Sequence, residues 1–508
     1  MLVDGAPRVS CVTPVRRVVG RTVTTVDGLP ADVRRAWADA FVAAGASQCG
    51  FCTPGIVMRL AALADRPNVD EAAIRTALLA HLCRCTGWQT VVEAACAVLG
   101  VVPAGGPGPA NPQAANPQAA DPQAANPPVG RDPLLAAWRA QLEGPMFQSV
   151  GPGTVLGHAG FADDTAPIGA VVAVPDGDRL TTGDTPAEAR RRSGKVQGRN
   201  STVPLVHPVD VPPGDWALSL RTTWVEPAYL EPDASWCAPG GPPASPLANG
   251  GAFGGKRRSP VPEAAHALAT EMGRAVRVLW SREDVVRRGP KRPPVAIGIR
   301  ADGTGVLRLA RSGPDLLDAA VERIDQVAPG LTVEVVDVVG PPTSTDLRGA
   351  GWAEAAAVTA ALAAITAGRT GPGTAAEVDG PTGGRARVVV ADDGTVAVDV
   401  WAGEVLDPVT LRSYCLGAVH QALGWVRSEG VAVDQDGAVH DLTIRSFGIL
   451  SARDTPHVDV TLHPSDRWPV NGSDAVFAAT AAAAWLADGL APTWPTRRGG
   501  AGLPGGGS

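Results

Sequence analysis

The sequence predicts an α+β protein made of a compact unit of about four helices, followed by a larger mixed α/β region. Three observations support this prediction. Apolar residues recur at helical spacing between residues 30 and 99, and proline-rich repeats then interrupt the chain between 103 and 130. Beyond residue 134, short strand-like runs alternate with alanine-rich helical stretches; these are Val171–Val174, Val388–Val390, 352–367 and 475–487.

The helical unit is expected to begin at Pro30, because proline suits the first turn of a helix, and its first helix is expected to end at Gly45. Thr53 is expected to open a second helix and to cap it with its hydroxyl group. Asp70 is expected to cap a third helix, and a fourth should run from about Trp88 to Leu99. Helices of this length are marginal alone, so their apolar faces must pack on one another or on the rest of the chain.

A linker separates the two parts of the chain. Its Asn-Pro-Gln-Ala-Ala repeats place a proline at every fifth position, which excludes a regular helix, and they are too polar to be buried. We therefore expect an extended Pro/Ala-rich linker over residues 103–131. The helical domain then covers residues 30–102, the larger domain 132–490, and a flexible tail 491–508.

Composition and charge exclude several classes of function. The chain has 508 residues, of which about a fifth are glycine or proline and 45% are hydrophobic, so we expect a loop-rich but folded protein. A net charge of −7 has the wrong sign for a protein that binds a phosphate backbone, and we expect no nucleic-acid partner. No apolar run is long enough to span a membrane, and residues 1–5 do not resemble a secretory signal. We therefore expect a cytoplasmic protein with no membrane partner.

Four of the eight cysteines form two close pairs. In a reducing compartment such pairs are typical of metal or redox ligands rather than of disulfides. Cys49 and Cys52 precede the second expected helix, and Cys83 and Cys85 fall in the turn before the fourth, so the intervening helices should return the chain and bring four thiolates together. Such ligands suit zinc or an iron-sulfur cluster, and spacing alone does not decide between them. Cys96 is expected to lie in the helical core.

Two motifs around these cysteines resemble a known domain. They are Gln48-Cys-Gly-Phe-Cys-Thr-Pro-Gly55 and His81-Leu-Cys-Arg-Cys-Thr-Gly-Trp88, and they are similar to the second 2Fe-2S domain of the xanthine dehydrogenase and aldehyde oxidase family, the molybdenum hydroxylases. The resemblance implies that Cys49, Cys52, Cys83 and Cys85 bind a 2Fe-2S cluster, which favours iron over zinc. It also implies that Gln48 and Cys85 approach the pterin of a molybdenum cofactor.

Residues 1–29 resemble only the last stretch of the ferredoxin-like 2Fe-2S domain that comes first in this family. Cys11 stands in the place of the last ligand of that domain, and its first three ligands are absent. We therefore expect residues 1–29 to be a remnant of that domain, which cannot form the first cluster from this chain alone. Cys11 is expected to be an exposed or half-buried free thiol.

Several segments beyond the linker resemble the molybdopterin-binding part of the same family, in the same order. The run Gly250-Gly-Ala-Phe-Gly-Gly-Lys256 resembles its glycine loop, which implies that Gly251, Phe253 and Gly254 approach the cofactor. Similar matches around 348–351 and 420–425 imply the same role for Arg348 and Gln421. The region is much shorter than its counterpart, so we expect a shortened molybdopterin-binding domain.

The glycine run has two other interpretations. A nucleotide phosphate loop is disfavoured, because Arg257 stands where a Ser or Thr should bind magnesium and no strand precedes the run. A plain glycine-rich turn remains as the alternative.

The family places its catalytic base, a glutamate, in a Gly-x-Gly-Glu run near the C-terminus. This chain has Val470-Asn-Gly-Ser-Asp474 in that position, which implies that Asp474 is the catalytic residue, with a side chain one methylene shorter. Ser473 and Asp474 directly precede an alanine-rich helix, so capping of that helix is the alternative interpretation and the one we favour.

The resemblance implies an iron-sulfur oxidoreductase that hydroxylates an N-heterocycle or aldehyde at a molybdenum centre, with electron transfer through a 2Fe-2S cluster. The implied cofactors are the 2Fe-2S cluster and molybdenum-molybdopterin, and the implied partners are a small-molecule substrate and a flavin or ferredoxin-type electron-acceptor subunit. One alternative is a degenerate family member that acts only in iron-sulfur electron transfer or assembly. A zinc-stabilised binding module is another alternative.

Overall fold

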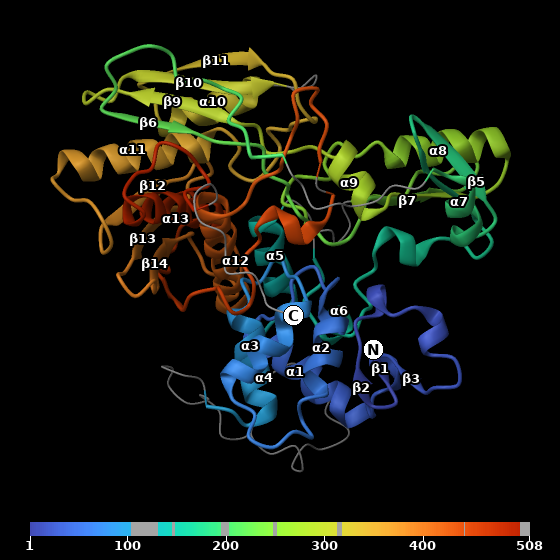
Figure 1. Ribbon diagram of the computed structural model, residues 1–508. Coiled ribbons are helices and arrows are strands. Elements are labelled where there is room, and N and C mark those ends of the chain that lie inside the picture. Colours follow the sequence, from blue (N-terminus) through green and yellow to red (C-terminus); the bar gives the residue numbers. More distant parts are fainter. Residues whose placement is uncertain are drawn as a thin grey trace.

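The computed structural model describes residues 1–102, 131–144, 148–194, 203–246, 251–311, 317–440 and 442–497. These residues form three parts: a helical unit, a side lobe built on one sheet, and a core built on two sheets (Figure 1). The helical unit, drawn in blue, lies beneath the core, and the side lobe projects to the right. The described residues confirm the α+β prediction.

The helical unit opens with a small antiparallel sheet in the order β2-β1-β3, formed by β1 (Leu2–Val3), β2 (Ala6–Pro7) and β3 (Val23–Thr24). Four helices follow as expected: α1 (Ala31–Ala44), α2 (Thr53–Ala61), α3 (Glu71–Ala77) and α4 (Gln89–Leu99). Gly45 ends α1 with a left-handed φ of 67°, which glycine adopts at no steric cost. The carboxylate of Asp70 caps α3 by accepting a 2.7 Å hydrogen bond from the Ala73 N–H group.

The predicted cap of α2 is wrong. Cys52 is the residue that precedes the helix, and no side chain caps it. Thr53 already lies in the first turn, and its hydroxyl oxygen is 3.1 Å from the hydroxyl oxygen of Ser47. A residue inside the helix cannot accept from the N–H groups of the next turn, so the hydroxyl pairs with a neighbouring loop instead.

The side lobe contains a four-stranded sheet in the order β5-β4-β8-β7. Its strands are β4 (Val171–Asp176), β5 (Arg179–Gly183), β7 (Ala234–Cys237) and β8 (Val276–Leu279). Its helices are α7 (Pro186–Arg192), α8 (Val261–Met272) and α9 (Arg282–Arg288), of which α8 packs on β7 and β8.

The core contains two four-stranded sheets with equivalent topology. One has the order β11-β10-β9-β6 and the other the order β12-β13-β14-β15. In each sheet the last strand pairs in parallel after a crossover helix, which parallel pairing requires: α10 (Asp318–Val327) before β11 and α12 (Pro408–Arg427) before β15. The strands are β6 (Leu218–Arg221), β9 (Val295–Ile299), β10 (Gly305–Arg311), β11 (Leu331–Asp337), β12 (Ala375–Asp379), β13 (Arg385–Val390), β14 (Val396–Trp401) and β15 (Val458–Leu462).

A layer of helices joins the two sheets of the core. The helix α11 (Trp352–Thr366) contacts β6 and β9 of one sheet and β12 of the other, and α13 (Ser473–Ala487) packs on α11, α12, β12 and β13. Almost every residue of α13 is buried, and most of these residues are alanines. Their small side chains allow the α13 backbone to lie close to α12. The predicted helices at 352–367 and 475–487 and the strands at 171–174 and 388–390 are confirmed.

Two short helices connect the helical unit to the core. The helix α5 (Pro133–Glu143) packs on α12, and α6 (Pro152–Val155) packs on α1 and α2. Residues 103–130 of the predicted linker lie outside the described residues. Within the described residues, no helix is long and apolar enough to cross a membrane.

The predicted flexible tail is wrong for residues 491–497. Trp494 is only 1% exposed, and its backbone N–H group donates a 2.9 Å hydrogen bond to the carbonyl oxygen of Arg221 in β6. A tryptophan that buries its ring against the core gains enough free energy to hold the segment in place. Residues 498–508 lie outside the described residues.

Candidate functional site

The structure brings the four predicted cysteine ligands together, and we call this group the cysteine site. Cys49 and Cys52 lie directly before α2, and Cys83 and Cys85 lie in the turn before α4. The Sγ atoms of Cys49 and Cys85 are 3.7 Å apart. The Cys52 and Cys83 thiols form a second hydrogen-bonded pair. The expected convergence of two distant motifs is therefore present.

The electrostatics of the cysteine site favour a bound cation. The hydrogen bond from Cys52 lowers the pKa of Cys83 to about 6, and the same bond, with burial, raises the pKa of Cys52. The pKa of Cys85 is raised by its hydrogen bond to Cys49, by burial and by the other thiols. Four thiolates at these distances repel one another, so a cation among them would balance their charge.

The four thiols match the ligand set of a 2Fe-2S cluster, in which four cysteines are shared between two irons. The two pairs that they form suit such sharing, with two thiols for each iron. Four sulfur ligands also suit zinc, so the choice of iron rests on the sequence resemblance. Cys96 is 2% exposed in the helical core and Cys11 is exposed, as expected.

Predicted cofactor-binding residues surround the cysteine site. The Gln48 Nε2 atom donates to the Cys85 carbonyl oxygen at 2.9 Å and to the Ser413 hydroxyl at 3.0 Å, whereas its buried Oε1 atom accepts no hydrogen bond from a described residue. Gly251 has a left-handed φ of 59°, and a Cβ atom on it would lie 2.8 Å from the Cys85 sulfur. Only glycine allows the loop to approach the cysteines so closely.

Other predicted residues line a cavity next to the cysteine site. Phe253, Arg348 and Gln421 form part of its wall. The Arg348 guanidinium lies 4.9 Å from the centre of the Phe253 ring, and Gly254, at a φ of 97°, packs its Cα against the Asp346 backbone. Sequence reasoning missed several wall residues, which include Arg84, Glu226, Arg292, Trp425 and Phe477.

The cavity is small and its charges are paired. Its volume is about 40 Å³, enough for a few water molecules, whereas pockets for organic ligands typically measure ~300–1,000 Å³. Three guanidinium groups in its wall form ion pairs with buried or half-buried carboxylates: Arg84 with Glu429, Arg292 with Glu354, and Arg348 with Asp474. The described wall does not fit a molybdopterin cofactor unless it opens.

The structure gives Asp474 a position that sequence analysis did not foresee. Its carboxylate accepts a 2.7 Å hydrogen bond from Arg348 Nε and is 27% exposed. It does not cap α13, and neither does Ser473, which is the first residue of that helix. The capping interpretation that we favoured is therefore wrong, and the role of Asp474 as a base stays a prediction.

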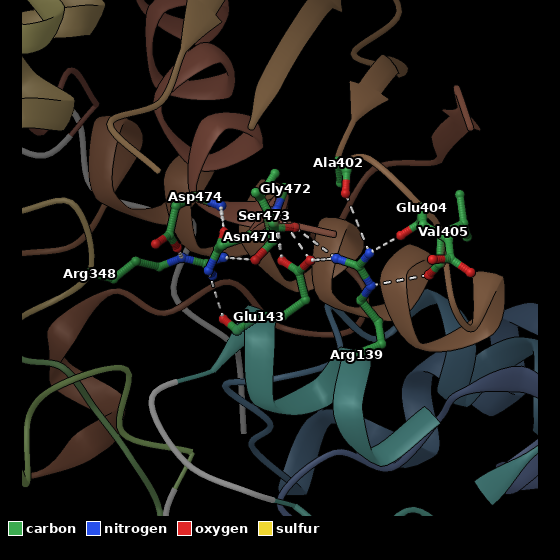
Figure 2. Close-up of polar contacts among 11 residues, drawn as sticks. Arg139, Glu143, Arg348, Ala402, Glu404, Val405, Asn471, Gly472, Ser473 and Asp474 are labelled. Atoms are coloured by element: carbon green, nitrogen blue, oxygen red, sulfur yellow. Dashed lines mark hydrogen bonds and ion pairs between the residues drawn. The ribbon is translucent and has the colours of Figure 1, made fainter. Parts of the chain in front are cut away.

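The carboxylate of Glu143, from α5, binds the start of α13 instead (Figure 2). It accepts hydrogen bonds from the N–H groups of Gly472 at 3.1 Å and Ser473 at 2.8 Å, and from Arg139 Nη1 at 2.9 Å. Both side chains of this Arg139–Glu143 pair are fully buried. A negative charge at the start of a helix is favourable, so a side chain distant in sequence shares the capping of α13 with a local one, because Asn471 Oδ1 accepts a 2.9 Å hydrogen bond from the Asp474 N–H group. No local sequence signal predicts the contact with Glu143.

Comparisons with known proteins identify the part of the chain that contains the cysteine site. Residues 25–96 match the 2Fe-2S binding domain family. Over 99 residues the chain is 34% identical to a probable xanthine dehydrogenase subunit of Bacillus subtilis, and over 95 residues it is 40% identical to the nicotine 6-hydroxylase small subunit of Paenarthrobacter nicotinovorans. These alignments cover 19% and 18% of this chain, and 57% and 58% of the two relatives. The chain thus spans little more than half of each relative.

The fold also has a counterpart among solved structures. An aldehyde oxidoreductase from Desulfovibrio desulfuricans matches with a TM-score of 0.68 at 13% identity, over 98% of this chain and 94% of that one. The sequence and fold comparisons together confirm the resemblance to the xanthine dehydrogenase and aldehyde oxidase family of iron-sulfur and molybdenum enzymes. The sequence match supports the 2Fe-2S cluster, which the described geometry fits, and the match to the solved structure shows the fold.

Proposed function

We propose that this chain, whose residues 25–96 match the 2Fe-2S binding domain family and whose fold is that of the aldehyde oxidoreductases, is an iron-sulfur oxidoreductase that transfers electrons through the cysteine site. The observation that carries the proposal is the convergence of Cys49, Cys52, Cys83 and Cys85 as two close pairs. We further propose that residues 30–102 form the cluster domain and residues 132–490 a shortened molybdopterin-binding domain.

A bound 2Fe-2S cluster supplies a centre that accepts and releases single electrons. The residues of this chain hold the cluster, exclude water and connect it to the surface. Cys49, Cys83 and Cys85 are buried, whereas Phe51, between the two ligands of the first motif, is 41% exposed and lies edge-to-face on Phe161 with their ring centres 5.4 Å apart. This exposed edge suits electron exchange with a partner, for which we propose a flavin or ferredoxin-type subunit.

A second candidate function is hydroxylation of an aldehyde or N-heterocycle by the same chain. The observation that supports it is the convergence of Phe253, Arg348 and Gln421 beside the cysteine site, although the cavity that they line is too small for the cofactor as it stands. One relative is named as the small subunit of a nicotine 6-hydroxylase, and the fold counterpart is named an aldehyde oxidoreductase. A bound molybdenum cofactor would supply the oxidising centre for this reaction. Opening of the cavity and a free Asp474 carboxylate are then required.

Redox titration of the full-length chain distinguishes the two functions. Reversible one-electron reduction of a 2Fe-2S chromophore, with no turnover of aldehydes or N-heterocycles, supports electron transfer alone. Turnover that requires bound molybdenum supports the hydroxylase. A chain that binds no iron after anaerobic reconstitution contradicts both functions.

A further inference from the structure

The ligand loop Cys83–Cys85 is built against the core rather than within the helical unit alone. A Cβ atom on Gly417 of α12 would lie 1.8 Å from the Cys85 carbonyl oxygen, and a Cβ atom on Gly87 would lie 2.5 Å from the Leu416 carbonyl oxygen. The backbones of the loop and of α12 are therefore in direct contact. Only glycine at both positions permits this approach.

Side chains of the core also hold the backbone of this loop. The Gln421 Nε2 atom, from α12, donates to the Arg84 carbonyl oxygen at 2.9 Å. Gln48, which bonds the Cys85 carbonyl oxygen, is in turn bonded to Ser413 of α12. The carbonyl groups of Arg84 and Cys85 are thus both held by α12, the first directly by Gln421 and the second through Gln48.

Arg84, the residue between the two ligands of this loop, is the strongest link. Its Nη1 and Nη2 atoms bind the Oε1 and Oε2 atoms of Glu429 at 2.6 Å each, and its Nε atom donates to the Pro227 carbonyl oxygen at 3.1 Å. The Arg84 side chain is 8% exposed and that of Glu429 is 1% exposed. A bidentate pair in a buried position has well-defined geometry, and each charge compensates the other.

We propose that the Arg84–Glu429 pair positions the ligand loop and that its two charges shift the reduction potential of the cluster in opposite directions. Reduction adds one negative charge to a cluster whose ligand loop contains the Arg84 cation. That cation stabilises the reduced state, whereas the Glu429 carboxylate opposes it, and both act strongly because water is excluded. Arg84 and Glu429 are positioning residues, since they act on the cluster through its ligands. The proposal rests on the proposed function, because it needs a bound cluster.

The test is a double-variant cycle in the full-length, reconstituted chain, followed by redox titration with EPR detection. Glu429→Gln removes the carboxylate charge and should shift the potential to a more positive value. Arg84→Gln removes the cation and should shift it to a more negative value. The double variant is neutral at both positions and should return the potential close to that of the wild type. The control is Asp488→Asn, which removes the carboxylate of a second bidentate pair, with Arg427 of α12, and should cause no shift.

Each outcome decides the proposal. Equal potentials in all five proteins overturn it, as do shifts of the same sign in both single variants. If Glu429→Gln loses its iron, continued loss in the double variant supports the positioning role of the pair, whereas recovery of the cluster shows that the unpaired Arg84 charge caused the loss and contradicts that role. A wild-type chain without a cluster contradicts the proposed function itself, before the variants are compared.

Discussion

The cysteine site and the cavity share the loop around Arg84, but the chain builds them in different ways. The ligands of the cysteine site come from two short motifs that flank helices of one unit. The wall of the cavity comes from segments spread between residues 84 and 477. In the first, four thiols already lie together as two pairs, whereas the second is small and its guanidinium groups are paired with carboxylates of the same chain. Local motifs thus provide ligands, but a large organic cofactor needs space that only the assembled core can provide.

The largest expected effect concerns the cysteine site. Replacement of Cys52 or Cys83 by Ser should remove the cluster, because a hydroxyl is a much poorer ligand for iron than a thiolate. Iron content, acid-labile sulfide and the visible spectrum of the purified variants measure this loss. Cys96→Ser is the matched control, since Cys96 is as buried as Cys83 but lies in α4 outside the ligand set. Retention of the full chromophore by both ligand variants would contradict the assignment.

The next effect concerns Glu143, which binds the start of α13, the helix that carries the cavity-wall residue Phe477. Glu143→Ala leaves Arg139 buried without its partner and removes the acceptor for the first N–H groups of α13. Loss of one partner of a buried pair costs about 3–5 kcal/mol, and urea denaturation should show a decrease of this size in the free energy of unfolding.

The control for that experiment is Glu377→Ala, because Glu377 forms its ion pair with Arg385 on the surface, where both side chains are about half exposed. Its free energy of unfolding should stay close to that of the wild type. Equal effects of the two substitutions would show that Glu143 does not hold α13.

The next prediction compares two Gly→Ala substitutions in helices, one in contact with the ligand loop and one with free space around it. Gly417→Ala places a methyl group against the Cys85 carbonyl, and such overpacking costs about 1–3 kcal/mol. The variant should also lose iron faster to a chelator, because the ligand loop must move. Gly55→Ala in α2 meets only His81 at 3.8 Å, so it should stabilise the chain by about 0.5–1 kcal/mol. If the two variants had the same stability and lost iron at the same rate, the claim that α12 holds the ligand loop would be contradicted.

The smallest effect on stability is expected at Asp474. The Asp474 carboxylate is partly exposed, and the buried Arg348 guanidinium also donates to Gln421 and Ser473, so Asp474→Asn should lower the free energy of unfolding by only about 1 kcal/mol. If the chain is a hydroxylase, the same variant should lose turnover, because an amide cannot accept the proton that a base removes. Unchanged turnover in a molybdenum-loaded preparation would exclude Asp474 as the base.

The same contrast explains what sequence analysis could predict. The four helices, the cap at Asp70 and the cysteine pairs follow from local patterns, in which a few neighbouring residues determine the structure. The partners of Arg84 and of the α13 N-terminus could not be predicted, because Glu429 and Glu143 lie hundreds of residues away from the groups they bind. Asp474 shows the same limit. A local pattern predicted that Asp474 caps α13, but the side chains of Glu143 and Asn471 accept from its first N–H groups, and the Asp474 carboxylate binds Arg348.

The measurement that tests the central claim most directly is the metal and sulfide content of the anaerobically reconstituted full-length chain. The account predicts two iron atoms and two acid-labile sulfides per chain, held by the cysteine site whether or not molybdenum is present, and an EPR signal that appears on one-electron reduction. One zinc ion per chain, with no labile sulfide and no EPR signal, would contradict it.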